Sequence, residues 1–216
     1  MEEAFWQARW RDGKTAFHEG RSNRFLSAHL SVLGLSAGDT VYVPLCGKAV
    51  DLDWLLEQGY RVVGAEFNRG AVEAVFERLG LARDERGAGE LVSQDGGRLR
   101  IFVGDVFDVT AEVLGPVQAV YDRAATVALP PALRARYAGH VAETARGAQQ
   151  LVISFDYEQS QTEGPPFSVP AGDLARLHAG RYRGEVIDSA PISGPLAARC
   201  AGTEFAMHLA PIPGAA

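Results

Sequence analysis

Charged side chains stand directly after apolar segments at three points of this 216-residue chain. Glu66 ends the segment YRVVGAE, Asp105 follows RIFVG, and Arg123 follows AVYD. A carboxylate at the end of a buried strand can accept hydrogen bonds from the two hydroxyls of a ribose. A guanidinium in such a place has to reach water, a carboxylate or an anionic ligand, because burying it unpaired is costly. These positions are therefore candidates for a nucleoside site with an anion beside it.

The turn after residues 40–45 contains a single glycine, Gly47, in the string PLCGK. Gly47 lets the backbone turn tightly and approach a ligand before the next helix, with Leu45 at the strand end. A full dinucleotide turn has three glycines, so this turn alone is equally typical of an ordinary connection. Glu66 follows roughly 20 residues later, the spacing expected of a ribose acceptor. The combination favours a nucleoside site, with a surface carboxylate at Glu66 as the alternative.

The other candidates each have a structural alternative. Asp105 suits an exocyclic amine and Val106 an adenine face, although Asp-Val at a strand end is common. Arg123 has a salt bridge to Asp122 or Glu66 as its alternative to ligand binding. The string GPPFSVP at residues 164–170 contains three prolines and presents Phe167, either as the wall of an apolar pocket or as part of a rigid surface crossover.

Metal and covalent chemistry find no support in the sequence. The five histidines are scattered without the spacing of metal ligands. No serine stands in a nucleophile elbow, and nothing in the sequence indicates a histidine partner for Cys46. We therefore predict no metal site, and we expect Cys46 to be a small packed side chain.

Hydrophobic periodicity predicts an α/β fold in which strands alternate with helices. Two helices are expected within residues 2–33, and Pro131 to Arg146 suit a further helix with proline in its first turn. Residues 89–107 are typical of a hairpin that turns at Asp95-Gly96-Gly97. The remaining predicted strands are residues 40–45, 60–67, 116–123, 149–157, 182–192 and 203–212, and the remaining helices are residues 51–58, 71–80 and 172–180. This order predicts a parallel, doubly wound sheet with one antiparallel strand near the end of the chain.

Composition limits the partners. The net charge of −6 and the absence of basic clusters argue against nucleic-acid binding. The acidic start MEEAFWQARW is unlike a secretory signal, and no apolar run approaches the ~20 residues of a membrane span. Two cysteines, Cys46 and Cys200, are too few to crosslink a chain of this size. We expect one domain over residues 1–216, located in the cytoplasm, away from membranes and monomeric.

Several strings together resemble the thiopurine S-methyltransferase family. They are FWQARW at residues 5–10, GKTAFH at residues 13–18, VPLCGKAVDLDWL, QGYRVVGAEF, YDRAA and GPPFSVP. They occur in the same order and span nearly the whole chain, which makes the resemblance far more specific than the single glycine turn. The resemblance implies a Rossmann-like class I fold with a seven-stranded, mostly parallel sheet that contains one antiparallel strand. It further implies that residues 1–38 form a helical lid over an α/β core of residues 39–216.

The resemblance also implies the cofactor, S-adenosyl-L-methionine, and the residues of its site. The residues around the cofactor would be Trp10, Leu45, Gly47, Glu66, Asp105, Val106 and Arg123. Phe17 would face the acceptor ring, and Arg123 would lie near both cofactor and acceptor. A second basic acceptor contact has no clear counterpart in residues 189–200, where Arg199 is the nearest candidate.

The expected reaction is methyl transfer to the sulfur of a small aromatic or heterocyclic thiol. Such a thiol is largely thiolate at neutral pH, so no general base is required and Arg123 would be auxiliary. The expected by-product is S-adenosyl-L-homocysteine. Three alternatives remain: the same fold acting on selenium or tellurium species or on halide and thiocyanate, a nicotinamide oxidoreductase, and a nonenzymatic binding module. The PLCGK turn argues against the oxidoreductase, because it has one glycine where a dinucleotide turn has three.

Overall fold

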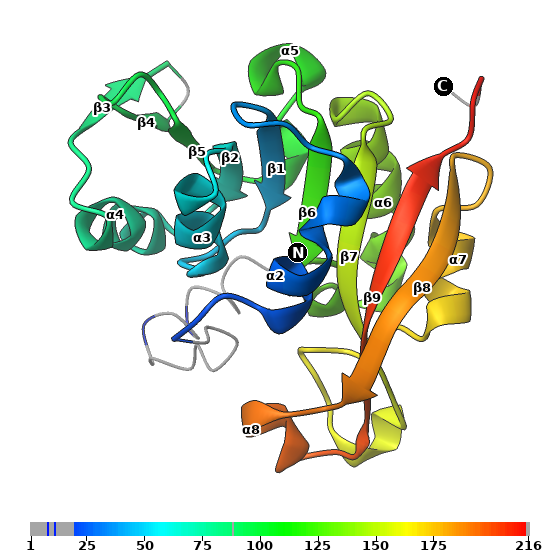
Figure 1. The fold of residues 1–216 in the computed structure, drawn as a ribbon. Helices are drawn as coiled ribbons and strands as arrows, with labels where there is room; N and C mark the ends of the chain where they lie inside the picture. The colour runs from blue at the N-terminus through cyan, green and yellow to red at the C-terminus, as the bar shows by residue number, and fades with distance from the viewer. Residues whose placement is uncertain (1–7, 9–10, 12–19, 88, 215–216) are drawn as a thin grey trace.

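The protein is described by a computed structural model that covers residues 8, 11, 20–87 and 89–214. Within these residues one sheet of nine strands has the order β3-β4-β5-β2-β1-β6-β7-β9-β8 (Figure 1). The strands are β1 Thr40–Pro44, β2 Arg61–Glu66, β3 Arg83–Arg86, β4 Glu90–Ser93, β5 Leu99–Val103, β6 Ala119–Arg123, β7 Gln149–Tyr157, β8 Tyr182–Pro191 and β9 Gly202–Pro211.

The predicted doubly wound sheet is confirmed. Strands β5, β2, β1, β6 and β7 pair in parallel, whereas β9 pairs antiparallel with both β7 and β8. The seven strands from β5 to β8 thus contain one that runs opposite to the rest, as the family resemblance implies. The predicted hairpin is β4–β5, and β3 extends the sheet beyond β4. The sequence did not predict β3, because its four residues, RDER, are all charged and show no apolar alternation.

Helices cover both faces of the sheet (Figure 1). The helices are α2 Arg24–His29, α3 Asp51–Glu57, α4 Arg69–Arg78, α5 Ala111–Leu114, α6 Pro131–Thr144, α7 Ala171–Leu177 and α8 Gly194–Ala197. Side chains of α2, α3 and α4 share one buried cluster with the sheet, and those of α5 and α6 share another. Alternation along β1 explains this division, because Val41 and Val43 face the first cluster and Tyr42 the second. Among the described residues, no helix combines the length and apolar composition that a bilayer span requires.

The second predicted N-terminal helix is present as α2, which continues into a 3-10 turn, η1 Leu30–Leu33. Asn23 begins α2, and its side-chain oxygen accepts a hydrogen bond from Phe25 N at 2.9 Å. The apolar side chains of α2 and η1 are buried against the sheet. The first predicted helix lies mostly outside the described residues, as do Trp10 and Phe17. The division into a lid of residues 1–38 and a core of residues 39–216 therefore stays a prediction.

Candidate active site

The carboxyl ends of β1, β2 and β5 lie side by side and are joined by hydrogen bonds. Cys46 N donates to Ala65 O at 3.1 Å, and Gly104 N donates to Glu66 O at 3.1 Å. Gly47 N donates to the side chain of Glu66 at 3.0 Å. Parallel strands bring these ends to one edge of the sheet, which is where open α/β folds bind ligands. The structure thus brings Leu45, Gly47, Glu66 and Asp105 to one edge, as the sequence predicts.

Glu66 is a deeply buried carboxylate at this edge, with 4% of its surface exposed. The surface alternative for Glu66 is therefore wrong. Its Oε2 accepts from Gly47 N, and its Oε1 accepts from Asn68 N at 2.8 Å. Burial raises the pKa of Glu66 to about 7, and the hydrogen bonds from the backbone only partly oppose this rise. The backbone N–H of Phe67 also stabilises the ionised carboxylate. A carboxylate can accept about four hydrogen bonds, so acceptor capacity remains for a ligand hydroxyl.

The turn after β1 has an unusual backbone. Leu45 has φ 50° and Gly47 has φ 53°, so both are left-handed. This conformation suits glycine but costs about 1–3 kcal/mol for a residue such as leucine. Between them, the side chain of Cys46 is 4% exposed and belongs to the core, as expected for a packed cysteine. Burial raises the pKa of the Cys46 thiol, and the carboxylate of Glu66 raises it further.

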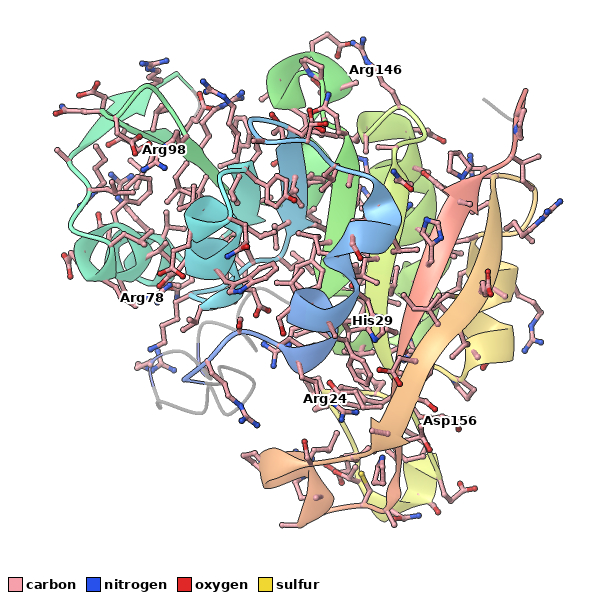
Figure 2. All side chains as sticks on the ribbon, in the orientation of Figure 1. Arg24, His29, Arg78, Arg98, Arg146 and Asp156 are labelled. Atoms are coloured by element: carbon pink, nitrogen blue, oxygen red, sulfur yellow. The ribbon has the colours of Figure 1, made fainter. Side chains whose placement is uncertain are left out.

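Arg78 of α4, labelled in Figure 2, forms hydrogen bonds to the backbone of this turn. The sequence analysis did not predict this role. Its guanidinium donates to Lys48 O at 2.9 Å and to Ala49 O at 3.2 Å. The same guanidinium binds both carboxylate oxygens of Asp53, each at 2.7 Å. A forked guanidinium can hold a carboxylate and two carbonyls at once, so Arg78 fixes α3, α4 and the turn relative to one another. Arg78 lies 30 residues from Lys48, and no local pattern marks this contact.

Asp105 and Val106, in the segment after β5, differ in their exposure to solvent. Asp105 is exposed, and its Oδ1 accepts from Phe107 N at 3.0 Å, which caps the 3-10 turn η2 Val106–Asp108. Val106 is 1% exposed and packs in the core, so its side chain presents almost no surface to a ligand in this structure. A methyl group on Gly104 would meet nothing within 4 Å, so open space lies beside this strand end.

Arg123 ends β6, which pairs with β1 on one side and β7 on the other. Its side chain is half-buried, and the following Ala124 has φ 61°. The preceding Asp122 is 2% exposed and holds this bend. Its carboxylate accepts from Thr126 N at 3.1 Å, Thr126 Oγ1 at 2.7 Å and Tyr137 OH at 2.9 Å. Burial nevertheless raises the pKa of Asp122. These bonds fix the backbone from which the Arg123 side chain extends.

A buried polar cluster that the sequence did not predict joins the start of α2 to this edge. Asp51 accepts from Asn23 N at 2.6 Å and from Tyr121 OH at 3.1 Å. The side chain of Asn23 donates to Glu204 of β9 at 3.4 Å. The cluster combines residues from α2, α3, β6 and β9, so only the folded chain brings them together.

Three further contacts involve α2, β8 and the segment after β7. His29 at the end of α2 pairs with Asp188 of β8, with 2.7 Å between Nε2 and Oδ2 (Figure 2). Arg199 donates to Thr162 Oγ1, in the segment that follows β7. Phe167, from the same segment, is half-buried, and its backbone N–H donates to Val127 O at 2.7 Å. Among the described residues, no three His, Cys, Asp or Glu side chains are grouped as ligands of a metal ion.

Comparison with known proteins decides the family. The family model for thiopurine S-methyltransferase matches residues 1–204. The chain belongs to the thiopurine S-methyltransferase family. A thiopurine S-methyltransferase of Xanthobacter autotrophicus is 45% identical over 94% of this chain and 96% of its own. One of Gluconobacter oxydans is 39% identical over 97% of this chain and 95% of its own. The protein is thus an S-adenosylmethionine-dependent methyltransferase.

Solved structures agree on the fold. The 1,6-didemethyltoxoflavin-N1-methyltransferase of Burkholderia thailandensis, solved with S-adenosylhomocysteine, superposes with a TM-score of 0.66 at 16% identity. The match covers 96% of this chain and 86% of that one. A TehB-like methyltransferase of Corynebacterium glutamicum gives a TM-score of 0.58 at 12% identity and covers 97% of each chain. The class I methyltransferase fold predicted from the resemblance is therefore confirmed.

Proposed function

We propose that this methyltransferase acts on the sulfur of small aromatic or heterocyclic thiols, as the names of its relatives indicate. The observation that carries the proposal is the 45% identity to a thiopurine S-methyltransferase over 94% of this chain. Over such a length, the strand ends and the segments around them belong to the shared region. A thiolate acceptor would attack without losing a proton in the same step, so the proposed reaction requires no general base.

The described residues fit the cofactor that the family uses. S-adenosylmethionine supplies an activated methyl group on a sulfonium. Glu66 offers a buried carboxylate with remaining acceptor capacity, in the place where a ribose binds in such folds. Leu45 and Gly47 shape the adjacent turn, and the exposed Asp105 follows Gly104 and the open space beside it. We assign Val106 to the adenine face from the resemblance, although its side chain is packed in the core. We assign Trp10 to the cofactor from the resemblance, because it lies outside the described residues.

The acceptor would lie beyond β6 and β7. Arg123 extends from the bend that Asp122 holds and would favour the anionic form of an acceptor by its charge. Phe167 would border the acceptor from the segment after β7. Phe17 is assigned to the acceptor ring from the resemblance, since it too lies outside the described residues. Positioning of two bound partners by such side chains can contribute ~7–11 kcal/mol to lowering a reaction barrier.

An acceptor panel tests the proposal. Purified protein with S-adenosylmethionine would be offered an aryl thiol, a thiopurine, selenite, tellurite, iodide and thiocyanate, and S-adenosylhomocysteine would be measured. We expect the highest kcat/KM with the aryl thiol or the thiopurine. Higher kcat/KM with a metalloid or halide acceptor would refute the proposed acceptor class while leaving the methyltransferase assignment intact. We further propose a cytoplasmic monomer that binds neither nucleic acid nor membranes, which gel filtration and cell fractionation would check.

A further inference from the structure

Arg134 in the first turns of α6 is a buried cation that is not in direct contact with a carboxylate of the described residues. It is 8% exposed, and it forms no ion pair with any carboxylate of the described residues. Burial lowers the pKa of its guanidinium, and the negative charge of Asp173 only partly offsets this effect. Helix formation alone does not explain an arginine here, because an apolar side chain of similar volume would fill the space at a lower cost in free energy.

The contacts of Arg134 join the segments that follow β6 and β7. Its Nε donates to Leu129 O at 2.9 Å, in the segment between β6 and α6. Its Nη1 lies 3.5 Å from Ser168 O, in the segment between β7 and α7. Its guanidinium carbon lies 5.4 Å from the centre of the Phe167 ring, within the range of a cation–π contact. One side chain therefore touches both segments that border the acceptor side of the sheet.

The Phe167 ring also packs against Gly164. A methyl group on Gly164, which has φ 74°, would lie 2.7 Å from the Phe167 Cδ1 atom. The backbone of Gly164 therefore packs closely against the ring that Arg134 contacts. The segment is also tied to β7, because Tyr157 OH donates to Pro166 O at 2.5 Å and Ser154 Oγ donates to Val169 O at 2.8 Å. Two kinds of contact connect the segment to the one after β6: the backbone hydrogen bond from Phe167 N to Val127 O and the side-chain contacts of Arg134.

We propose that Arg134 is a positioning residue that sets the separation between Arg123 and Phe167, and thereby the selectivity of this enzyme among thiols of different size. The inference rests on the proposed function for the identity of the acceptor. Arg134 touches neither the turn after β1 nor Glu66, so its effect falls on acceptor recognition and not on cofactor binding. A forked, planar guanidinium can contact two carbonyls and a ring together, which the single ammonium of lysine cannot.

Two variants test the proposal. Arg134→Met keeps the length and apolar stem, and Arg134→Lys keeps the charge but loses the fork. For both, we expect a loss of about ten- to a hundredfold in kcat/KM for a small aryl thiol, because slight misplacement of a binding group is costly. We expect the ratio of kcat/KM between naphthalene-2-thiol and thiophenol to change at least about threefold. The Kd of S-adenosylhomocysteine should stay within about twofold. Arg183→Met, on the exposed β8, is the matched control.

Hydrogen exchange supplies a readout that needs no acceptor. In both Arg134 variants, peptides covering residues 159–170 should exchange faster than in the parent protein, while peptides covering β1 and α3 should not change. An unchanged thiol ratio, or unchanged exchange in residues 159–170, would overturn the role of Arg134. A parent protein without activity on any thiol would instead overturn the proposed function, and the exchange data would still decide whether Arg134 anchors the segment.

Discussion

The buried carboxylate of Glu66 makes cofactor binding depend on pH. Burial raises the pKa of Glu66 from 4.5 to about 7, so near neutral pH a substantial part of the free protein holds the protonated acid. Ribose hydroxyls donate to the ionised form better than to the acid, because hydrogen bonds to a charged group are stronger. Binding therefore requires loss of the proton at low pH. Above pH 8 the carboxylate is already ionised.

The magnitude follows from this pKa. With a pKa of about 7, the Kd of S-adenosylhomocysteine should weaken about tenfold between pH 8 and pH 6, and about tenfold more between pH 6 and pH 5. The same carboxyl also affects folding. Because its folded pKa lies above its ordinary value, it makes the protein more stable at low pH. The free energy of unfolding of the unliganded protein should fall by ~3 kcal/mol as the pH rises from about 4.5 to about 7.

Isothermal titration with S-adenosylhomocysteine at pH 5, 6, 7 and 8 measures this dependence. Repeating it in buffers of different ionisation enthalpy counts the protons released on binding. Glu66→Gln is the matched variant, since its amide keeps the size but does not titrate. We expect it to bind about ten- to a hundredfold more weakly at pH 8 and to show no slope with pH. An equal slope in the parent and in Glu66→Gln would refute the assignment of the pH dependence to this carboxyl.

Three further predictions concern Arg123, the buried thiol and the tightly packed glycines. Arg123→Ala should retain measurable methyl transfer, because a thiolate acceptor needs no base, and complete loss of turnover with normal cofactor affinity would contradict this. The thiol of Cys46, buried and with a raised pKa, should resist a thiol reagent in the folded protein and react after denaturation. Gly64→Ala should lower the free energy of unfolding by about 1–3 kcal/mol, because its methyl would lie 2.8 Å from Cys46 Sγ, and adding Cys46→Ala should recover part of this loss. Gly202→Ala should be more severe, since its methyl would lie 2.3 Å from the backbone oxygen of Asp156, and thermal unfolding would show both effects.

The prediction of the fold succeeded where local patterns determine structure. Apolar alternation and the order of strands and helices were enough to predict the parallel sheet and the hairpin at β4–β5. They failed at β3, where a charged segment forms a strand only because β4 offers an edge to pair with. The short helices α5 and α8 were also not predicted, since four residues carry too little periodicity.

For the site, the sequence by itself determined which side chains stand at strand ends, because the carboxyl end of each strand can be located from its apolar run. That was sufficient for Leu45, Glu66, Asp105 and Arg123. Only the tertiary structure decided how each of these is held. Glu66 is a buried acid that accepts a hydrogen bond from Gly47 in the turn after β1, and Val106 is a core residue that shares a buried cluster with side chains of α6.

The residues that support the site, Arg78 and Arg134, could not be predicted because their partners are distant in the sequence. Arg78 reaches the turn after β1 from a helix 30 residues away, and Arg134 reaches Ser168 across 34 residues. The spacing of residues along the chain reports contacts within one helix or strand. It does not report which distant backbone carbonyl a long side chain will meet, because that depends on how the helices pack against the sheet.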